Sequence, residues 1–342
     1  MIIKVNTSIE NELGELFNYL KIESPYFRFI PNQKIVIAPR FNKAQHIQHM
    51  SGVIETIDIE TPYQLASNSW KKSTQFEIKN IPMGGELFNI IAGPCSVESE
   101  DHIFKTAEFL HKLGIKFIRG GAYKPRTSPY SFMGLGKKGL QYLHQAAKQY
   151  DLRVVTEIMD LSLLDEVLEY SDILQVGSRN MHNFFMLNEL GKLTKPIMLK
   201  RGMQAKVTEW LLAAEYILSG GNEKVILCER GIRSFDPESR NVMDIGIIPL
   251  IKELSHLPII ADPSHGTGAS SRVEAMALAS TAAGANGLMI EIHPEPKKAL
   301  SDSAQAISFE QFETLLVKVG VLLGSFNQLA DNSTPILKLQ TL

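Results

Sequence analysis

Hydrophobic and polar positions follow two alternating patterns along most of this chain. From about residue 87 onward, short runs rich in β-branched residues alternate with longer segments whose apolar residues recur at helical spacing. Each run predicts a strand, and the segments 102–113 and 209–218, which end at glycines, predict helices. The predicted strands are 87–93, 117–121, 153–158, 173–177, 196–200, 225–229, 258–262 and 287–292.

Strands that alternate regularly with helices predict a parallel sheet covered by helices. The number of units between residues 87 and 325 fits a closed (β/α)₈ TIM barrel better than an open doubly wound sheet. A dinucleotide-binding fold is further disfavoured, because no Gly-x-Gly-x-x-Gly or Walker motif follows the first strand. We therefore expect an α/β protein with its catalytic barrel at 87–325 and a C-terminal tail at 326–342.

The first 70 residues carry a different pattern. Strands are predicted at 2–5, 26–30, 34–38 and 53–59, with helices at 9–20 and 42–50. This βαββαβ order is typical of a ferredoxin-like unit, so we expect a small α+β domain over residues 1–70. A linker with a short β-hairpin is expected over residues 71–86.

Charge and composition exclude several classes of protein. The formal net charge is only −2, so nothing global points to nucleic acid or to a membrane surface, and any anion site must arise locally. Two cysteines fit a reducing compartment better than a disulfide framework. The first residues lack the pattern of a signal peptide, and no apolar run reaches the ~18 residues of a membrane span. We expect a cytoplasmic protein.

Ionisable residues concentrate where the predicted strands end. In a (β/α)₈ barrel the active site forms at the C-terminal ends of the strands, so these residues should converge. Independent surface turns would not produce this arrangement, and we interpret it as an active site. The residues at or just after the strand ends are Cys95, Arg119, Glu157, Arg179, Lys200, Arg230, His265, Glu291 and Asp302.

One set of these residues is cationic, and its densest part is the segment 119–129, RGGAYKPRTSP. Taken singly, each cation is as well explained by an exposed salt bridge. Together they would repel one another without anions, which predicts one or two phosphorylated or carboxylated substrates. The members are Arg119, Lys124, Arg126, Arg179, Lys200 and Arg230.

A second set consists of Cys95, His265, Glu291 and Asp302. A thiolate, an imidazole and two carboxylates suit one divalent transition metal, although only closure of the barrel would bring them together. Cys95 taken alone is better explained by a small buried thiol than by a metal ligand. His293 competes with Glu291 as a ligand, and the residue pattern does not separate the two. Cys228 lies inside a predicted strand and is assigned to the core.

Several short segments occur in order across the whole predicted barrel. They are AGPCSVES (92–99), RGGAYKPRTSP (119–129), LKRG (199–202), LCERG (227–231), DPSH (262–265), EIHP (291–294) and ALSD (299–302). Together they resemble 3-deoxy-D-arabino-heptulosonate 7-phosphate (DAHP) synthase of the type I β branch. The N-terminal unit resembles the regulatory domain that some members carry.

The resemblance implies condensation of phosphoenolpyruvate with erythrose 4-phosphate and release of phosphate, the first step of the shikimate pathway to aromatic amino acids. It implies Cys95, His265, Glu291 and Asp302 as ligands of one divalent metal ion, with Glu291 preferred to His293. Manganese, iron, cobalt and zinc all suit these ligands. A homotetramer is also implied.

The resemblance implies roles for individual residues. Catalytic roles fall to Lys124, Glu157 and His265, and either Glu157 or Lys124 would take the proton from the attacking water. The residues implied for phosphoenolpyruvate are Arg119, Lys124, Gly177, Ser178, Arg179, Lys200 and Arg230. Those implied for erythrose 4-phosphate are Lys124, Pro125, Arg126 and Thr127.

Two alternative functions were weighed. A synthase of 3-deoxy-D-manno-octulosonate 8-phosphate would use arabinose 5-phosphate, but in that family Ala-Asn-Arg typically follows the lysine, where this chain has Pro-Arg-Thr. A non-catalytic sensor is disfavoured by the intact metal and cation sets. The extra domain predicts feedback inhibition by tyrosine or phenylalanine, and the alternative is a unit that only stabilises oligomers.

Overall fold

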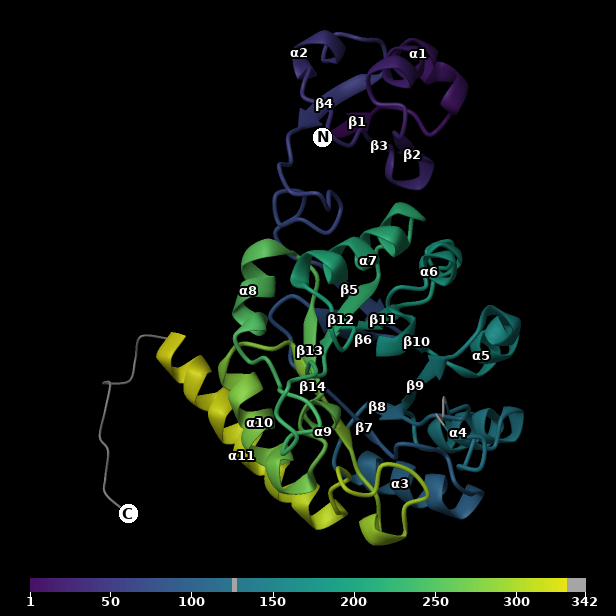
Figure 1. The fold of residues 1–342 in the computed structure, drawn as a ribbon, viewed down its shortest axis with the longest axis vertical. Coiled ribbons are helices and arrows are strands. Elements are labelled where there is room, and N and C mark those ends of the chain that lie inside the picture. The colour runs from purple at the N-terminus through teal and green to yellow at the C-terminus, as the bar shows by residue number, and fades with distance from the viewer. Residues whose placement is uncertain (125–127, 331–342) are drawn as a thin grey trace.

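The computed structural model places a small N-terminal unit above a larger barrel (Figure 1). The structure describes residues 1–124 and 128–330. The barrel is closed, and the pairs of neighbouring strands are parallel. This confirms the predicted (β/α)₈ architecture. Its strands, in the order in which they pair around the barrel, are β7 (Asn89–Gly93), β8 (Phe117–Arg119), β9 (Arg153–Ile158), β10 (Ile173–Val176), β11 (Ile197–Lys200), β12 (Val225–Glu229), β13 (Ile259–Ala261) and β14 (Gly287–Glu291).

Helices cover the outside of the barrel, and a short helix, α9 (Pro263–Thr267), follows β13 directly. The last helix runs to Ala330, beyond residue 325 where the tail was expected to begin. Of the helices in the described ranges, none combines the length and hydropathy needed to cross a membrane. The covering helices are α3 (Glu100–Lys112), α4 (Lys137–Gln149), α5 (Leu164–Tyr170), α6 (Phe184–Leu190), α7 (Val207–Ser219), α8 (Ile247–Leu254), α10 (Ser270–Ala282) and α11 (Phe309–Ala330).

The linker before the barrel closes its N-terminal end. Strands β5 (Gln75–Ile78) and β6 (Ile81–Gly84) form an antiparallel hairpin. Its buried residues Ile78 and Met83 belong to the same apolar cluster as Ile91, Met198 and other inward-facing residues of the barrel strands. The hairpin therefore fills the end of the barrel opposite to the C-terminal ends of the strands, and it lies at the position predicted for it.

The N-terminal unit is a four-stranded antiparallel sheet in the order β2-β3-β1-β4. The helix expected over 9–20 is instead a 3₁₀ turn, Glu10–Leu13, followed by a helix that begins at Gly14, with no side-chain cap on either. Assignment of the unit to the ferredoxin-like fold stays a prediction. Its elements are β1 (Ile2–Val5), α1 (Gly14–Glu23), β2 (Arg28–Ile30), β3 (Ile35–Ile37), α2 (Ala44–Ile47) and β4 (Val53–Ile57).

The N-terminal sheet packs against helices on both sides, because side chains alternate between the two faces of a strand. Ile3 faces the cluster formed with α1, whereas Ile2 belongs to the main apolar cluster shared with the barrel. Glu215 of α7 accepts hydrogen bonds from the backbone N–H groups of Leu65 (2.9 Å) and Ala66 (3.0 Å). The unit and the segment that follows it are thus fixed on the barrel near α7.

Candidate active site

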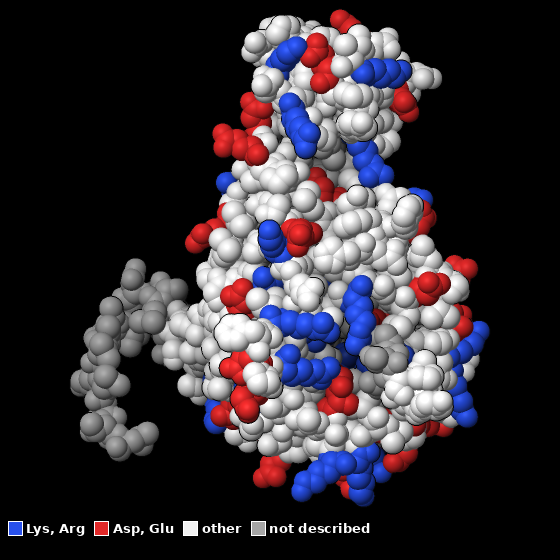
Figure 2. All heavy atoms as spheres, viewed as in Figure 1, with Lys and Arg blue, Asp and Glu red and all other residues white. Residues whose placement is uncertain are grey.

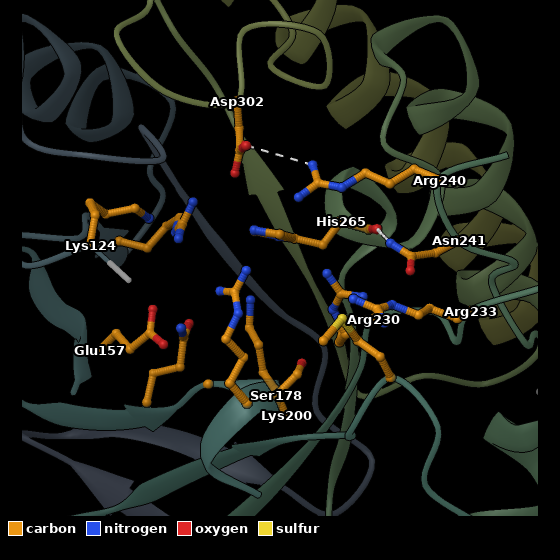
Figure 3. A pocket seen from close by; sticks show the side chains of 15 residues that line it. Lys124, Glu157, Ser178, Lys200, Arg230, Arg233, Arg240, Asn241, His265 and Asp302 are labelled. Carbon is orange, nitrogen blue, oxygen red and sulfur yellow. Dashed lines mark hydrogen bonds and ion pairs between the residues drawn. The ribbon is translucent and has the colours of Figure 1, made fainter. Parts of the chain in front are cut away.

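A cavity of about 350 Å³ opens at the C-terminal ends of the barrel strands. Figure 3 shows side chains from several strand ends pointing into it from opposite walls. Every described residue predicted to bind phosphoenolpyruvate lines it. The lining residues are Arg119, Lys124, Glu157, Gln175, Gly177, Ser178, Arg179, Lys200, Met203, Arg230, Arg233, Arg240, Asn241, His265 and Asp302.

The cavity is strongly basic, and the face of the molecule drawn in Figure 2 shows Lys and Arg side chains gathered around the barrel mouth. The cations at the bottom are at most 8% exposed, whereas those at the rim are exposed. Among the described residues, no ion pair to a carboxylate is found for Lys124, Arg179, Arg230 or Arg233. Unpaired cations of this density predict an anionic ligand. The deep cations are Arg119, Lys124, Lys200 and Arg230; the rim cations are Arg179, Arg233 and Arg240.

Glu157 and Gly177 lie against each other on adjacent strands. A Cβ atom at position 177 would lie 1.9 Å from Glu157 Oε1, so only glycine leaves room for the carboxylate. Residues 178–180 form a 3₁₀ turn directly after β10. Gly177 therefore allows Glu157 to face the cavity beside Ser178.

Lys124 is held at the bottom of the cavity. Its Nζ donates a hydrogen bond to the backbone carbonyl of Cys95 at 3.0 Å. A Cβ atom at position 121 would come within 2.8 Å of Lys124 Cδ, so Gly121 also makes room for this side chain. The other residues predicted for erythrose 4-phosphate, Pro125, Arg126 and Thr127, lie outside the described residues.

Three of the predicted metal ligands form one group. Donor atoms of Cys95, Glu291 and Asp302 all lie within 4.8 Å of one another, with Cys95 Sγ 3.3 Å from Asp302 Oδ2. His265 Nε2 lies 3.4 Å from Glu291 Oε1. His293 is not part of this group. A thiol, an imidazole and two carboxylates at these spacings fit one divalent transition metal.

Two residues of this group have strongly shifted pKa values. Burial, and next the charge of Glu291, raise the pKa of Cys95 to about 11. Burial would also raise the pKa of Glu291, but the charges of His265 and Arg119 outweigh it and lower that pKa to about 2. Arg119 NH1 donates to Glu291 Oε1 at 2.5 Å. A metal ion that takes this thiol as a ligand would have to displace its proton.

Asp262 organises two of the predicted residues, although it was not predicted as a site residue. It is fully buried, and its Oδ2 accepts hydrogen bonds from Lys200 Nζ at 2.6 Å and His265 Nδ1 at 2.7 Å. Burial alone would raise its pKa, but His265 and Lys200 hold it well below the usual range. Because Nδ1 is engaged, Nε2 of His265 is directed to Glu291, an arrangement typical of a histidine that binds metal.

Sequence reasoning missed several other residues of the site. Gln175 was detectable as one polar residue inside an apolar strand. Arg233, Arg240 and Asn241 come from the long connection between β12 and α8, which has no strand end to mark them. Gln305 donates a hydrogen bond to Glu291 Oε2 at 2.5 Å. It follows the last predicted motif in the sequence, so no motif marked it.

Comparison with known proteins agrees with this geometry. Residues 60–323 match the model of the DAHP synthetase I family. A phospho-2-dehydro-3-deoxyheptonate aldolase of Thermotoga maritima is 46% identical over 288 residues, which cover 84% of this chain and 83% of the relative.

The chain belongs to the DAHP synthetase I family. The prediction of a DAHP synthase is thereby confirmed. A crystal structure of the DAHP synthase from Thermotoga maritima superposes with a TM-score of 0.77 at 41% identity, covering 95% of this chain and 97% of that one. A truncated form of the same enzyme gives 0.73 at 44% identity over 77% of this chain and 97% of that one.

The sibling family is more distant. A 2-dehydro-3-deoxyphosphooctonate aldolase of Syntrophobacter fumaroxidans is 30% identical over 262 residues, which cover 71% of this chain and 90% of the relative.

Replacing Gly177 with alanine should displace the Glu157 carboxylate, because the new Cβ cannot share its position. We expect kcat to fall by about 100-fold, as for other misplaced catalytic groups, in a steady-state assay. Gly320→Ala in α11 is the matched control, since its Cβ would meet no atom within 4 Å. A normal kcat in Gly177→Ala would show that turnover does not depend on the position of Glu157.

Proposed function

We propose that this DAHP synthase condenses phosphoenolpyruvate with erythrose 4-phosphate and water, giving 3-deoxy-D-arabino-heptulosonate 7-phosphate and inorganic phosphate. The observation that carries the proposal is a cavity lined by seven Lys and Arg side chains directly beside the group of Cys95, His265, Glu291 and Asp302. Two phosphorylated substrates match that density of positive charge, and a metal ion matches the adjoining ligands.

The deep cations suit phosphoenolpyruvate. Arg119, Lys200 and Arg230 are each at most 5% exposed, and Arg119 and Lys200 are paired with Glu291 and Asp262, so a phosphate and a carboxylate bound there would add partners to these two and balance the charge of Arg230. Ser178 and Gly177 offer backbone N–H groups on the same wall, next to Arg179. This pocket would fix the enol ether with its reacting carbon toward the metal group.

The aldose would lie closer to the rim. Lys124 is the deep cation bonded to the backbone carbonyl of Cys95, a residue of the metal group, and Pro125, Arg126 and Thr127 follow it in sequence. We infer that this segment holds the phosphate of erythrose 4-phosphate. A divalent ion bound by Cys95, His265, Glu291 and Asp302 supplies Lewis acidity toward the aldehyde oxygen.

The chemistry then needs positioning and one proton acceptor. The enol carbon of phosphoenolpyruvate forms a bond to the aldehyde carbon, water adds to the carbon bearing the phosphate, and the phosphohemiketal expels phosphate. Arg119 and Lys200 stabilise negative charge on the phosphate that leaves. Of the two candidates for the proton of the water, Glu157 is an acceptor carboxylate with its Oε1 facing Gly177 at the cavity wall. We assign it that role, with Lys124 protonating the new hydroxyl.

A phosphate-release assay with both aldose phosphates tests the reaction. Erythrose 4-phosphate should give a kcat/KM about 100-fold above that of arabinose 5-phosphate, because a chain longer by one carbon would have to displace groups at the rim. The same assay with chelator should show no turnover. Preference for arabinose 5-phosphate would instead place the chain with the sibling family.

The two cysteines provide a matched test of the metal group. Cys95→Ala removes a thiolate ligand, so we expect loss of the metal ion held by this group, a decrease of about one equivalent per chain, and a fall in kcat of about 10³-fold or more, since Lewis-acid assistance contributes several kcal/mol. Cys228→Ala removes a buried thiol from inside β12, outside the metal group, and should keep metal and turnover. Metal analysis and turnover in metal-defined buffer report both effects. Equal loss in the two variants would point to a general effect of cavity formation.

We further propose that the N-terminal unit mediates feedback inhibition by tyrosine or phenylalanine. Its sheet shares an apolar core with the barrel, and Arg28 bonds Ser219 at the end of α7 (2.7 Å) and Asn188 of α6 (3.1 Å). A conformational change in the N-terminal unit would therefore alter its contacts with the barrel helices α6 and α7. Assembly as a homotetramer and a cytoplasmic location remain predictions.

Removal of residues 1–59 tests the regulatory proposal, because the match to the family begins at residue 60 and the segment bonded to Glu215 is kept. The shortened enzyme should retain turnover within about 10-fold and lose sensitivity to aromatic amino acids, since a coupling of 1–3 kcal/mol would vanish with the effector site. Full-length enzyme titrated with each aromatic amino acid is the control. If the full-length enzyme ignores all three, the unit has another role, such as stabilising oligomers.

A further inference from the structure

A second group of potential metal ligands lies outside the catalytic cavity. Donor atoms of Glu98, His102 and His293 all lie within 4.8 Å of one another. Glu98 comes from the loop between β7 and α3, His102 from the first turn of α3, and His293 from just beyond β14. None of the three lines the cavity, so the proposed reaction does not use them.

His102 is the unusual member of this group. It is 8% exposed, and neither Nδ1 nor Nε2 has a hydrogen-bond partner among the described residues. Its ring lies 4.3 Å from the ring of His293, measured between centroids. An unpartnered buried imidazole costs free energy, and buried polar groups in native proteins are almost always satisfied. A ligand that accepts a lone pair from His102 would remove that cost.

The other two residues are oriented toward the same point. His293 is 6% exposed, and its Nε2 lies 3.4 Å from Glu98 Oε2. Two donors that each lie ~2.1 Å from a tetrahedral ion are about 3.4 Å apart, so this spacing suits coordination by both. The second oxygen, Glu98 Oε1, accepts a hydrogen bond from Leu300 N at 2.8 Å, which fixes the carboxylate.

We propose that Glu98, His102 and His293 bind a second divalent transition-metal ion, with solvent completing the coordination. Two imidazoles and one carboxylate form a ligand set suited to Zn²⁺ or Co²⁺. His293 Nδ1 accepts a hydrogen bond from Glu295 N at 3.0 Å, so its proton resides on Nε2. On coordination that proton moves to Nδ1, and the N–H of the exposed Glu295 turns to solvent.

The position of this site gives the ion a structural role. Glu98 holds the loop at Leu300, two residues before Asp302, and His293 lies two residues after Glu291. An ion joining these residues to α3 would tie the segment between two proposed catalytic ligands to the body of the barrel. It would act on the position of those ligands rather than on substrate.

Co²⁺ titration of the full-length protein tests this site. In the Cys95→Ala background we expect about one equivalent of Co²⁺ per chain to remain after dialysis, with d–d absorption but no thiolate charge-transfer band. Adding His102→Leu should abolish that binding. This substitution replaces an unpartnered buried polar ring with an apolar side chain, so folding should survive and can be checked by thermal unfolding.

His111→Ala in the same background is the matched control, because His111 lies on the same helix but is exposed. This control should keep the bound Co²⁺, and Zn²⁺ should raise the Tm of Cys95→Ala but not of Cys95→Ala/His102→Leu. Absence of tight Co²⁺ binding in Cys95→Ala would overturn the proposal. So would retention of the ion in the His102→Leu double variant, or its loss in the His111→Ala control.

Discussion

Strand β14 pairs with β7 in register from Gly287 opposite Asn89 to Glu291 opposite Gly93, and this pairing closes the barrel. It joins the last strand of the barrel to the first, so residues nearly two hundred positions apart in sequence become neighbours. Cys95 follows one strand and Glu291 ends the other, and Asp302 returns from the loop beyond to within 3.3 Å of the thiol. Without closure of the barrel, these side chains would lie on separate loops and would not contact one another.

Charge balance sets how the rest of the site is arranged. Two fully buried carboxylates, Asp262 and Glu291, each hold a cation of the cavity bottom, Lys200 and Arg119 respectively. Buried charges are tolerated in a folded protein only when they are paired. These two carboxylates therefore allow Lys200 and Arg119 to be buried at the bottom of the cavity. Arg230 and Lys124 have no such carboxylate among the described residues, and burial lowers the pKa of Arg230, so an anionic ligand would stabilise the charges of both.

The barrel could be predicted well because its strands are short apolar runs and ionisable residues stand at their ends. Gly177 was predicted as a source of a backbone N–H group, but its contact with Glu157 depends on the register between β9 and β10, which no local pattern reveals. Arg233 and Arg240 lie in a long irregular connection where periodicity gives no signal. The group of Glu98, His102 and His293 likewise appears only after β14 and α3 have been packed together. The start of the N-terminal helix was predicted too early, because no capping residue in the sequence marks where it begins.

The hairpin of β5 and β6 determines from which end of the barrel molecules can reach the cavity. Because Ile78 and Met83 fill one end of the barrel, molecules reach the cavity from the other end. The cations there form two levels, with Arg119 and Lys200 buried and Arg179 and Arg233 exposed at the rim. If the two proposed substrates occupy these two levels, the one at the lower level must enter first. The depth of the pocket would then set the order in which they bind.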